Sequence, residues 1–92
     1  MKKCVKITFQ VPLKKDFLQN VVQQNARLFG LEGVAQTQAP DTVKIIAFGE
    51  IDAIDNLVDV LHKEATTYSI HNIEIEPFLK DRDYRGIFRV IE

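Results

Sequence analysis

The residues most suited to a chemical or binding role lie near the start of the chain, between a strand pattern and a helix pattern. Lys14 and Lys15 are adjacent cations, and Asp16, Phe17 and Leu18 lead directly into the helix pattern. Dipole and charge act together at a helix N-terminus, so a phosphate or carboxylate group would be attracted there. The opposing interpretation is a solvated lysine pair, because Asp16 can cap the helix and compete for the same N–H groups. These five positions form a candidate anion-binding site, and both interpretations stay open.

The side chains that bind transition metals are few and scattered. His62 and His71 fall on different expected elements, and Cys4 is remote from both. Zinc and iron sites need several such ligands at characteristic spacings, so we expect no metal and no cofactor. A single cysteine cannot form an intramolecular disulfide, and the chain starts without a signal-peptide pattern. A cytoplasmic location is therefore expected.

Two further groups of charged residues allow a functional interpretation. Asp52, Asp55 and Asp59 resemble a carboxylate cluster, but they lie opposite the apolar stripe of an expected helix, which favours a solvated face. Residues 81–86 form a charged loop before the last expected strand. This loop is interpreted either as a recognition loop or as a connection whose charges pair with one another.

Composition restricts the class of protein. With 92 residues and 46% hydrophobic content, the chain is expected to form one domain spanning 1–92 around one core. The net charge is −1 and tryptophan is absent, so the basic footprint of a nucleic-acid binder is missing. No apolar run is long enough to span a membrane. We expect neither nucleic acid nor membrane as a partner.

Hydrophobic periodicity predicts the elements that must position the candidate site. Strict alternation over 5–11 indicates a strand with one buried face, and apolar residues at i, i+3 and i+4 indicate two helices. The expected elements, in chain order, are a strand at 5–11, a helix at 18–29, strands at 33–39 and 42–48, a helix at 51–61, and strands at 70–75 and 87–91. This order predicts an α+β fold, the ferredoxin-like split β-α-β sandwich (βαββαβ plus a short closing strand), with two helices on one face of an antiparallel sheet.

Several segments of the chain carry a resemblance to a known family. Residues 26–34 read Ala-Arg-Leu-Phe-Gly-Leu-Glu-Gly-Val, Thr42-Val43 is followed by Gly49, and the chain closes with Phe88-Arg89-Val90. At these positions the chain resembles the acylphosphatase family, and the resemblance extends along nearly the whole length of the chain. Most of them are packing positions, so the resemblance speaks for the fold more than for activity.

The resemblance also implies where an active site would lie. Enzymes of the family hydrolyse acyl phosphates without metal or cofactor, using a Gln-Gly-Val-x-Phe-Arg loop that cradles the phosphoryl group and an Asn that orients water. Gln19 stands where the Arg is expected, and Thr37 stands where the Asn is expected. The preceding loop positions hold Lys14, Lys15, Asp16, Phe17 and Leu18. Both side chains with direct catalytic roles in the family are therefore different, and the loop has no glycine.

The sequence favours an acylphosphatase-like domain with lost or weakened activity that acts as a small binding or interaction module. Its expected partners are phosphate or another small anion, or a protein. The alternative is an acylphosphatase that still hydrolyses acyl phosphates to carboxylate and phosphate with altered residues. A small-ligand regulatory domain of the same architecture is a third possibility, so the question of enzymatic activity stays open.

Overall fold

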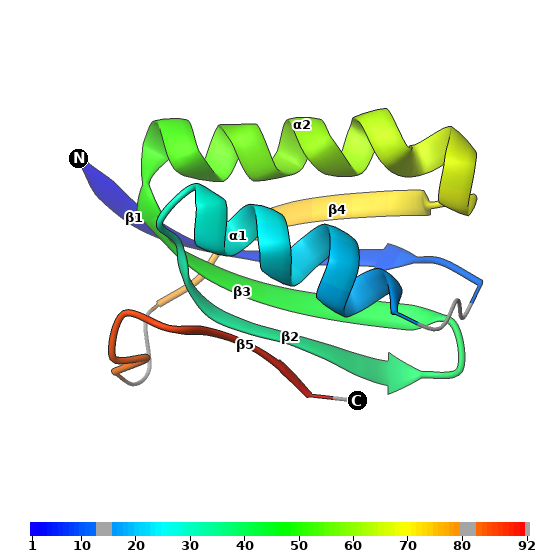
Figure 1. Ribbon diagram of the computed structural model, residues 1–92, viewed down its shortest axis with the longest axis horizontal. Helices are drawn as coiled ribbons and strands as arrows, with labels where there is room; N and C mark the ends of the chain where they lie inside the picture. The colour runs from blue at the N-terminus through cyan, green and yellow to red at the C-terminus, as the bar shows by residue number, and fades with distance from the viewer. Residues whose placement is uncertain (13–15, 80–82, 92) are drawn as a thin grey trace.

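A computed structural model describes residues 1–12, 16–79 and 83–91 of the chain (Figure 1). The described residues form one sheet of five strands. Two helical segments connect the first strand to the second, and one long helix connects the third strand to the fourth. The elements, in chain order, are β1 (Lys2–Gln10), η1 (Leu18–Gln23), α1 (Gln24–Leu28), β2 (Glu32–Ala39), β3 (Thr42–Glu50), α2 (Ile51–Tyr68), β4 (His71–Pro77) and β5 (Phe88–Ile91). The predicted ferredoxin-like α+β plan is confirmed.

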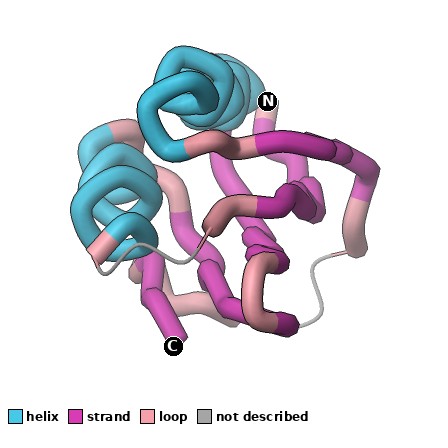
Figure 2. The backbone as a smooth tube through the Cα atoms, turned by 90° about the vertical axis from the view of Figure 1, so that its right-hand side faces the viewer, coloured by secondary structure: helices cyan, strands magenta, loops and turns pink. Residues whose placement is uncertain are grey.

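The core lies between the sheet and the helices, which cover the same side of the sheet (Figure 2). In β1 the alternating residues Val5, Ile7 and Phe9 are buried, while their neighbours are not. Successive side chains of a strand point to opposite faces, so this pattern turns one face of β1 toward the helices. From α2, Ile54 and Leu61 are fully buried against it. Burial of this one face fixes the register of the sheet.

The strand order in the sheet is β4-β1-β3-β2-β5. β1, β3, β2 and β4 pair in antiparallel fashion, whereas the closing strand β5 pairs with β2 in parallel. This parallel pair is the one departure from the expected antiparallel sheet. It follows from topology, because β5 returns to the edge of the sheet on the far side from β4.

The first helical segment differs from the expected α-helix in its first half. η1 is a π-helix, and regular α-helix begins only at Gln24. The expected C-cap at Gly30 is confirmed: Gly30 has φ 74, and the N–H of Leu31 donates to the carbonyl of Ala26 at 2.9 Å. This 6→1 bond and the Gly30 N–H to the Arg27 carbonyl form a Schellman motif, which directs the chain into β2.

The second helix is longer than the spacing predicted. α2 runs to Tyr68, beyond the expected end at 61, because Ala65 and Tyr68 continue the apolar stripe that Leu61 belongs to. Ser69 then takes a left-handed conformation and ends the helix. Among the helices of the described ranges, none has the length and apolar content that crossing a membrane requires.

Candidate functional site

The candidate site lies at one end of the sheet. There the end of β1, the start of η1 and the β2–β3 turn come together (Figure 1). The N–H of Val11 donates to the carbonyl of Asp41 at 2.8 Å, which ties the end of β1 to that turn. Val11, just after β1, therefore lies beside the turn between β2 and β3.

Phe17 and Leu18 point into the core. Phe17 is 3% exposed, and its ring meets Phe9 at 6.1 Å and Tyr68 at 4.9 Å between centroids, both in edge-on geometry. Leu18 is also buried. These side chains fasten the start of the helix to β1 and α2, so only their backbone groups can face an anion. Sequence reasoning missed this packing role of Phe17.

Replacing Phe17 with alanine tests this anchoring role. We expect Phe17→Ala to lower the free energy of unfolding by about 3–5 kcal/mol, the usual cost of truncating a buried phenylalanine. Urea unfolding followed by circular dichroism measures the loss. Leu28→Ala is the control, because Leu28 lies 78% exposed on α1 and should change stability by no more than about 0.5 kcal/mol. Equal losses in the two variants would contradict the anchoring role.

Asp16 has an unusual backbone conformation. Its φ is 77, a left-handed conformation that aspartate tolerates better than most residues, whereas Phe17 has ordinary helical angles. The carbonyl of Asp16 accepts the N–H of Asn20 at 2.8 Å, and the helix begins without a side-chain cap. The expected capping role of the Asp16 carboxylate is not observed.

Gln19 and Thr37 are held on the same side of the sheet. Gln19 is exposed on η1, which packs against β2, the strand of Thr37. Thr37 lies opposite Val43, which in turn lies opposite Phe9, so the half-buried Thr37 continues a row on the helix-covered face. A register shift follows directly after Thr37, and such bulges often re-aim side chains next to active sites.

The charge at this end of the sheet is unfavourable for an anion. The helix start (16–20) and the hairpin (37–43) contain the carboxylates of Asp16 and Asp41 and no lysine or arginine. Lys14 and Lys15 lie outside the described residues. Neither the helix start nor the hairpin therefore supplies a lysine or arginine for a phosphate group at this site. Gln19 can donate hydrogen bonds there but brings no charge.

Metal ligands do not gather at this site or elsewhere in residues 1–12, 16–79 and 83–91. No group of three or more histidine, cysteine, aspartate or glutamate side chains has a geometry that could hold a metal ion in these ranges. His71 approaches the carbonyl of Ser69 at 3.0 Å through its Nδ1.

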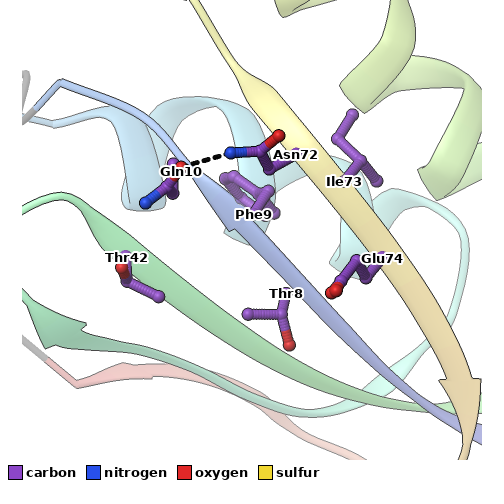
Figure 3. A pocket seen from close by; sticks show the side chains of 7 residues that line it. All are labelled: Thr8, Phe9, Gln10, Thr42, Asn72, Ile73 and Glu74. Carbon is purple, nitrogen blue, oxygen red and sulfur yellow. Dashed lines mark hydrogen bonds between the residues drawn. The ribbon is translucent and has the colours of Figure 1, made fainter.

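A separate hollow of about 550 Å³ opens where the β1–β4 ladder changes register (Figure 3). Asn72 has φ 58 at this break, and its amide donates a hydrogen bond to Oε1 of Gln10. The lining residues are Thr8, Phe9, Gln10, Thr42, Asn72, Ile73 and Glu74. Glu74 is the only charged group among them, so this hollow is unsuited to phosphate.

Comparison with known proteins shows the family to which this chain belongs. The family model of acylphosphatases matches residues 17–90. The chain therefore belongs to the acylphosphatase family, as the sequence resemblance predicted. The matched range includes Gln19 and Thr37. A search of curated proteins gave no match.

Solved structures share the fold at low sequence identity. An acylphosphatase from Coxiella burnetii matches with TM-score 0.83 and 24% identity, over 98% of this chain and 93% of that one. An acylphosphatase from Bacillus subtilis matches with TM-score 0.82 and 16% identity, over all of both chains. A full-length HypF in a phosphate- and nucleotide-bound form matches with TM-score 0.81 and 14% identity, over 100% of this chain and 12% of that one. These likenesses show the fold.

Proposed function

We propose that this acylphosphatase-like domain has lost most or all acylphosphatase activity and acts as a small binding module. Its ligand is phosphate or another small anion held near residues 14–19, and a protein partner and a cytoplasmic location belong to the same proposal. The observation that carries it is the exposed, uncharged Gln19, at the position where the sequence resemblance implies the family's arginine. The described segments at this end of the sheet, 16–20 and 37–43, contain two carboxylates and no lysine or arginine.

The physical argument concerns the charge that develops during phosphoryl transfer. A planar guanidinium fork matches a phosphoryl group in both charge and geometry, whereas a glutamine amide offers a neutral donor. Losing one preorganised donor to a developing oxyanion typically costs about a hundred- to a thousandfold in rate. Thr37 has a shorter reach than asparagine for orienting a water molecule. Two such changes together remove the basis for efficient hydrolysis.

The alternative function is hydrolysis of acyl phosphates with altered residues. Two observations favour it: Lys14 and Lys15 are close to Gln19 in sequence, and Thr37 keeps a hydroxyl on the helix-covered face. A lysine can supply a point charge, although not a fork. Turnover of an acyl phosphate separates this alternative from the binding module, because the module needs no turnover.

Phosphate titration tests the anion site directly. In a ¹H–¹⁵N NMR titration with inorganic phosphate, we expect the amides of residues 16–19 to shift with a dissociation constant on the order of 1 mM. The double variant Lys14→Gln/Lys15→Gln should weaken this binding by about tenfold, because it removes both cations next to the site.

The matched control is Lys2→Gln/Lys3→Gln, which removes two adjacent lysines that are exposed on β1. The dissociation constant for phosphate should stay within about twofold of that of the natural chain at moderate salt. Lys2 and Lys3 lie at the other end of β1, and salt screens exposed charges that are more than about 10 Å away. If phosphate shifts no amide of residues 16–19, or if both double variants weaken binding equally, the anion site at this loop is refuted.

A further inference from the structure

A second hollow lies beside the edge strand β5, and two arginines line it. Its volume is about 490 Å³, within the usual range for small-molecule sites. The lining residues are Gly33, Val34, Asp83, Tyr84, Arg85, Ile87, Arg89, Val90 and Ile91. Figure 1 shows the turn that leads into β5 at the end of the sheet opposite to the start of η1. The hollow is therefore separate from the candidate site near Gln19.

A tight turn presents the first arginine. The N–H of Ile87 donates to the carbonyl of Tyr84 at 3.1 Å, and the two residues between them, Arg85 and Gly86, have φ of 56 and 69. Two successive left-handed residues are the pattern of a type I′ turn. The N–H of Gly33 donates to the carbonyl of Ile87 at 3.0 Å, which fixes the turn to β2.

Arg85 occupies a backbone conformation that glycine, asparagine or aspartate would adopt more cheaply. A left-handed residue with a long side chain costs roughly 1–2 kcal/mol. Such strain persists only where surrounding contacts impose it, and it gathers at ligand clamps. Here Oδ1 of Asp83 accepts the N–H of Arg85 at 2.8 Å. The carboxylate nearest to Arg85 in sequence is thus bonded to the backbone of the turn.

Arg89 enters the hollow from β5. It lies opposite Val34 on β2, on the sheet face that the helices leave uncovered, because Val90 and Phe88 pack toward the core. In the part of the chain that the structure describes, no ion pair involves Arg85 or Arg89. Ile87 and Ile91, on the same face as Arg89, are 40% and 46% exposed. The hollow thus combines two available guanidinium groups with apolar flanks.

We infer that this hollow binds a small organic anion, in which a carboxylate or phosphate group meets Arg85 and Arg89 and a compact apolar body lies against Ile87 and Ile91. Guanidinium groups recognise both kinds of anion through paired N–H donors. The apolar flanks add affinity for a carbon skeleton that a bare inorganic ion lacks. The inference goes beyond the proposed function, since it concerns a different end of the sheet and different residues.

A ¹H–¹⁵N NMR titration with three probes tests the site. Phenyl phosphate and benzoate carry the two anionic groups on the same ring, and benzyl alcohol carries none. We expect at least one of the two anions to shift the amides of residues 33–34 and 85–91 at tenfold lower concentration than benzyl alcohol. The stronger of the two anions identifies the preferred group. Equal response to benzyl alcohol, or no response to either anion, overturns the inference.

Variants separate ligand recognition from stability. Arg89→Gln should weaken binding of the anion by about tenfold. Arg85→Gly should weaken binding by about the same factor while keeping or raising the melting temperature, because glycine relieves the left-handed strain. Lys63→Gln, which removes one exposed positive charge from α2, is the control and should leave binding unchanged. If Arg85→Gly and Arg89→Gln bind the anion as tightly as the natural chain, the inference is wrong. Shifts at residues 16–19 report the other site independently.

Discussion

The double variant Gln19→Arg/Thr37→Asn should hydrolyse benzoyl phosphate at least about a hundredfold faster than the natural chain. The expected gain comes from restoring a guanidinium for the phosphoryl group and an amide for the attacking water at two positions of an intact acylphosphatase fold. Gln19 is exposed on η1, so an arginine fits there without disturbing the core. Release of phosphate and loss of the acyl phosphate absorbance both measure the rate.

The gain should require both changes. Either single variant supplies only half of the arrangement, and effects of residues that act as a unit are strongly non-additive. The matched control is Gln24→Arg/Thr37→Asn, which adds the same charge at an exposed position of α1. The double variant at Gln19 should exceed this control by at least about tenfold. If the two rates are equal, the residue types at positions 19 and 37 do not explain the weak activity.

The second large effect concerns Gly33, the second residue of β2, which pairs with Ala47 of β3. A Cβ at this position would lie 1.8 Å from the carbonyl oxygen of Ile46 and 2.9 Å from its carbon, and φ is 145. Because both contacts are with backbone, no rotamer change can relieve them. We expect Gly33→Ala to lower the free energy of unfolding by at least about 3 kcal/mol, since the strands must separate locally and lose ladder hydrogen bonds.

Gly30→Ala is the matched control for this prediction. Gly30 also has a positive φ, but an added Cβ would meet nothing within 4 Å. Its replacement therefore costs only the left-handed strain, about 1–2 kcal/mol. Urea unfolding of both variants gives the comparison. A loss at Gly33 no larger than the loss at Gly30 would show that β2 and β3 do not approach as closely as the structure places them.

Much of the fold could be predicted because its signals are local. The alternation of Val5, Ile7 and Phe9 identified both β1 and its buried face, and Gly30 identified the end of the first helix. The π-helical start could not be predicted, since the spacing of Leu18 and Val21 suits either helix type. The parallel pairing of β5 with β2 also could not be predicted, because the edge of the sheet that β5 joins depends on tertiary packing.

The candidate site was predicted less completely. The resemblance to the family implied site positions at Gln19 and Thr37, and that assignment stays a prediction; the structure shows that η1, which contains Gln19, packs against β2, which contains Thr37. The packing of Phe17 between Phe9 and Tyr68 could not be foreseen, because it depends on α2, which brings Tyr68 from far along the sequence. The left-handed Arg85 was missed for a similar reason: its conformation depends on a side chain at Asp83 and on the docking of the turn to β2.

The most direct test of the central claim is the steady-state hydrolysis of benzoyl phosphate by the natural chain. Working enzymes commonly reach kcat/KM of about 10⁴–10⁸ M⁻¹s⁻¹, and losing two catalytic groups should reduce this by several powers of ten. After the rate in buffer is subtracted, we predict a kcat/KM no higher than about 10² M⁻¹s⁻¹. A kcat/KM of about 10⁴ M⁻¹s⁻¹ or more would contradict the account and establish an acylphosphatase that works with Gln19 and Thr37.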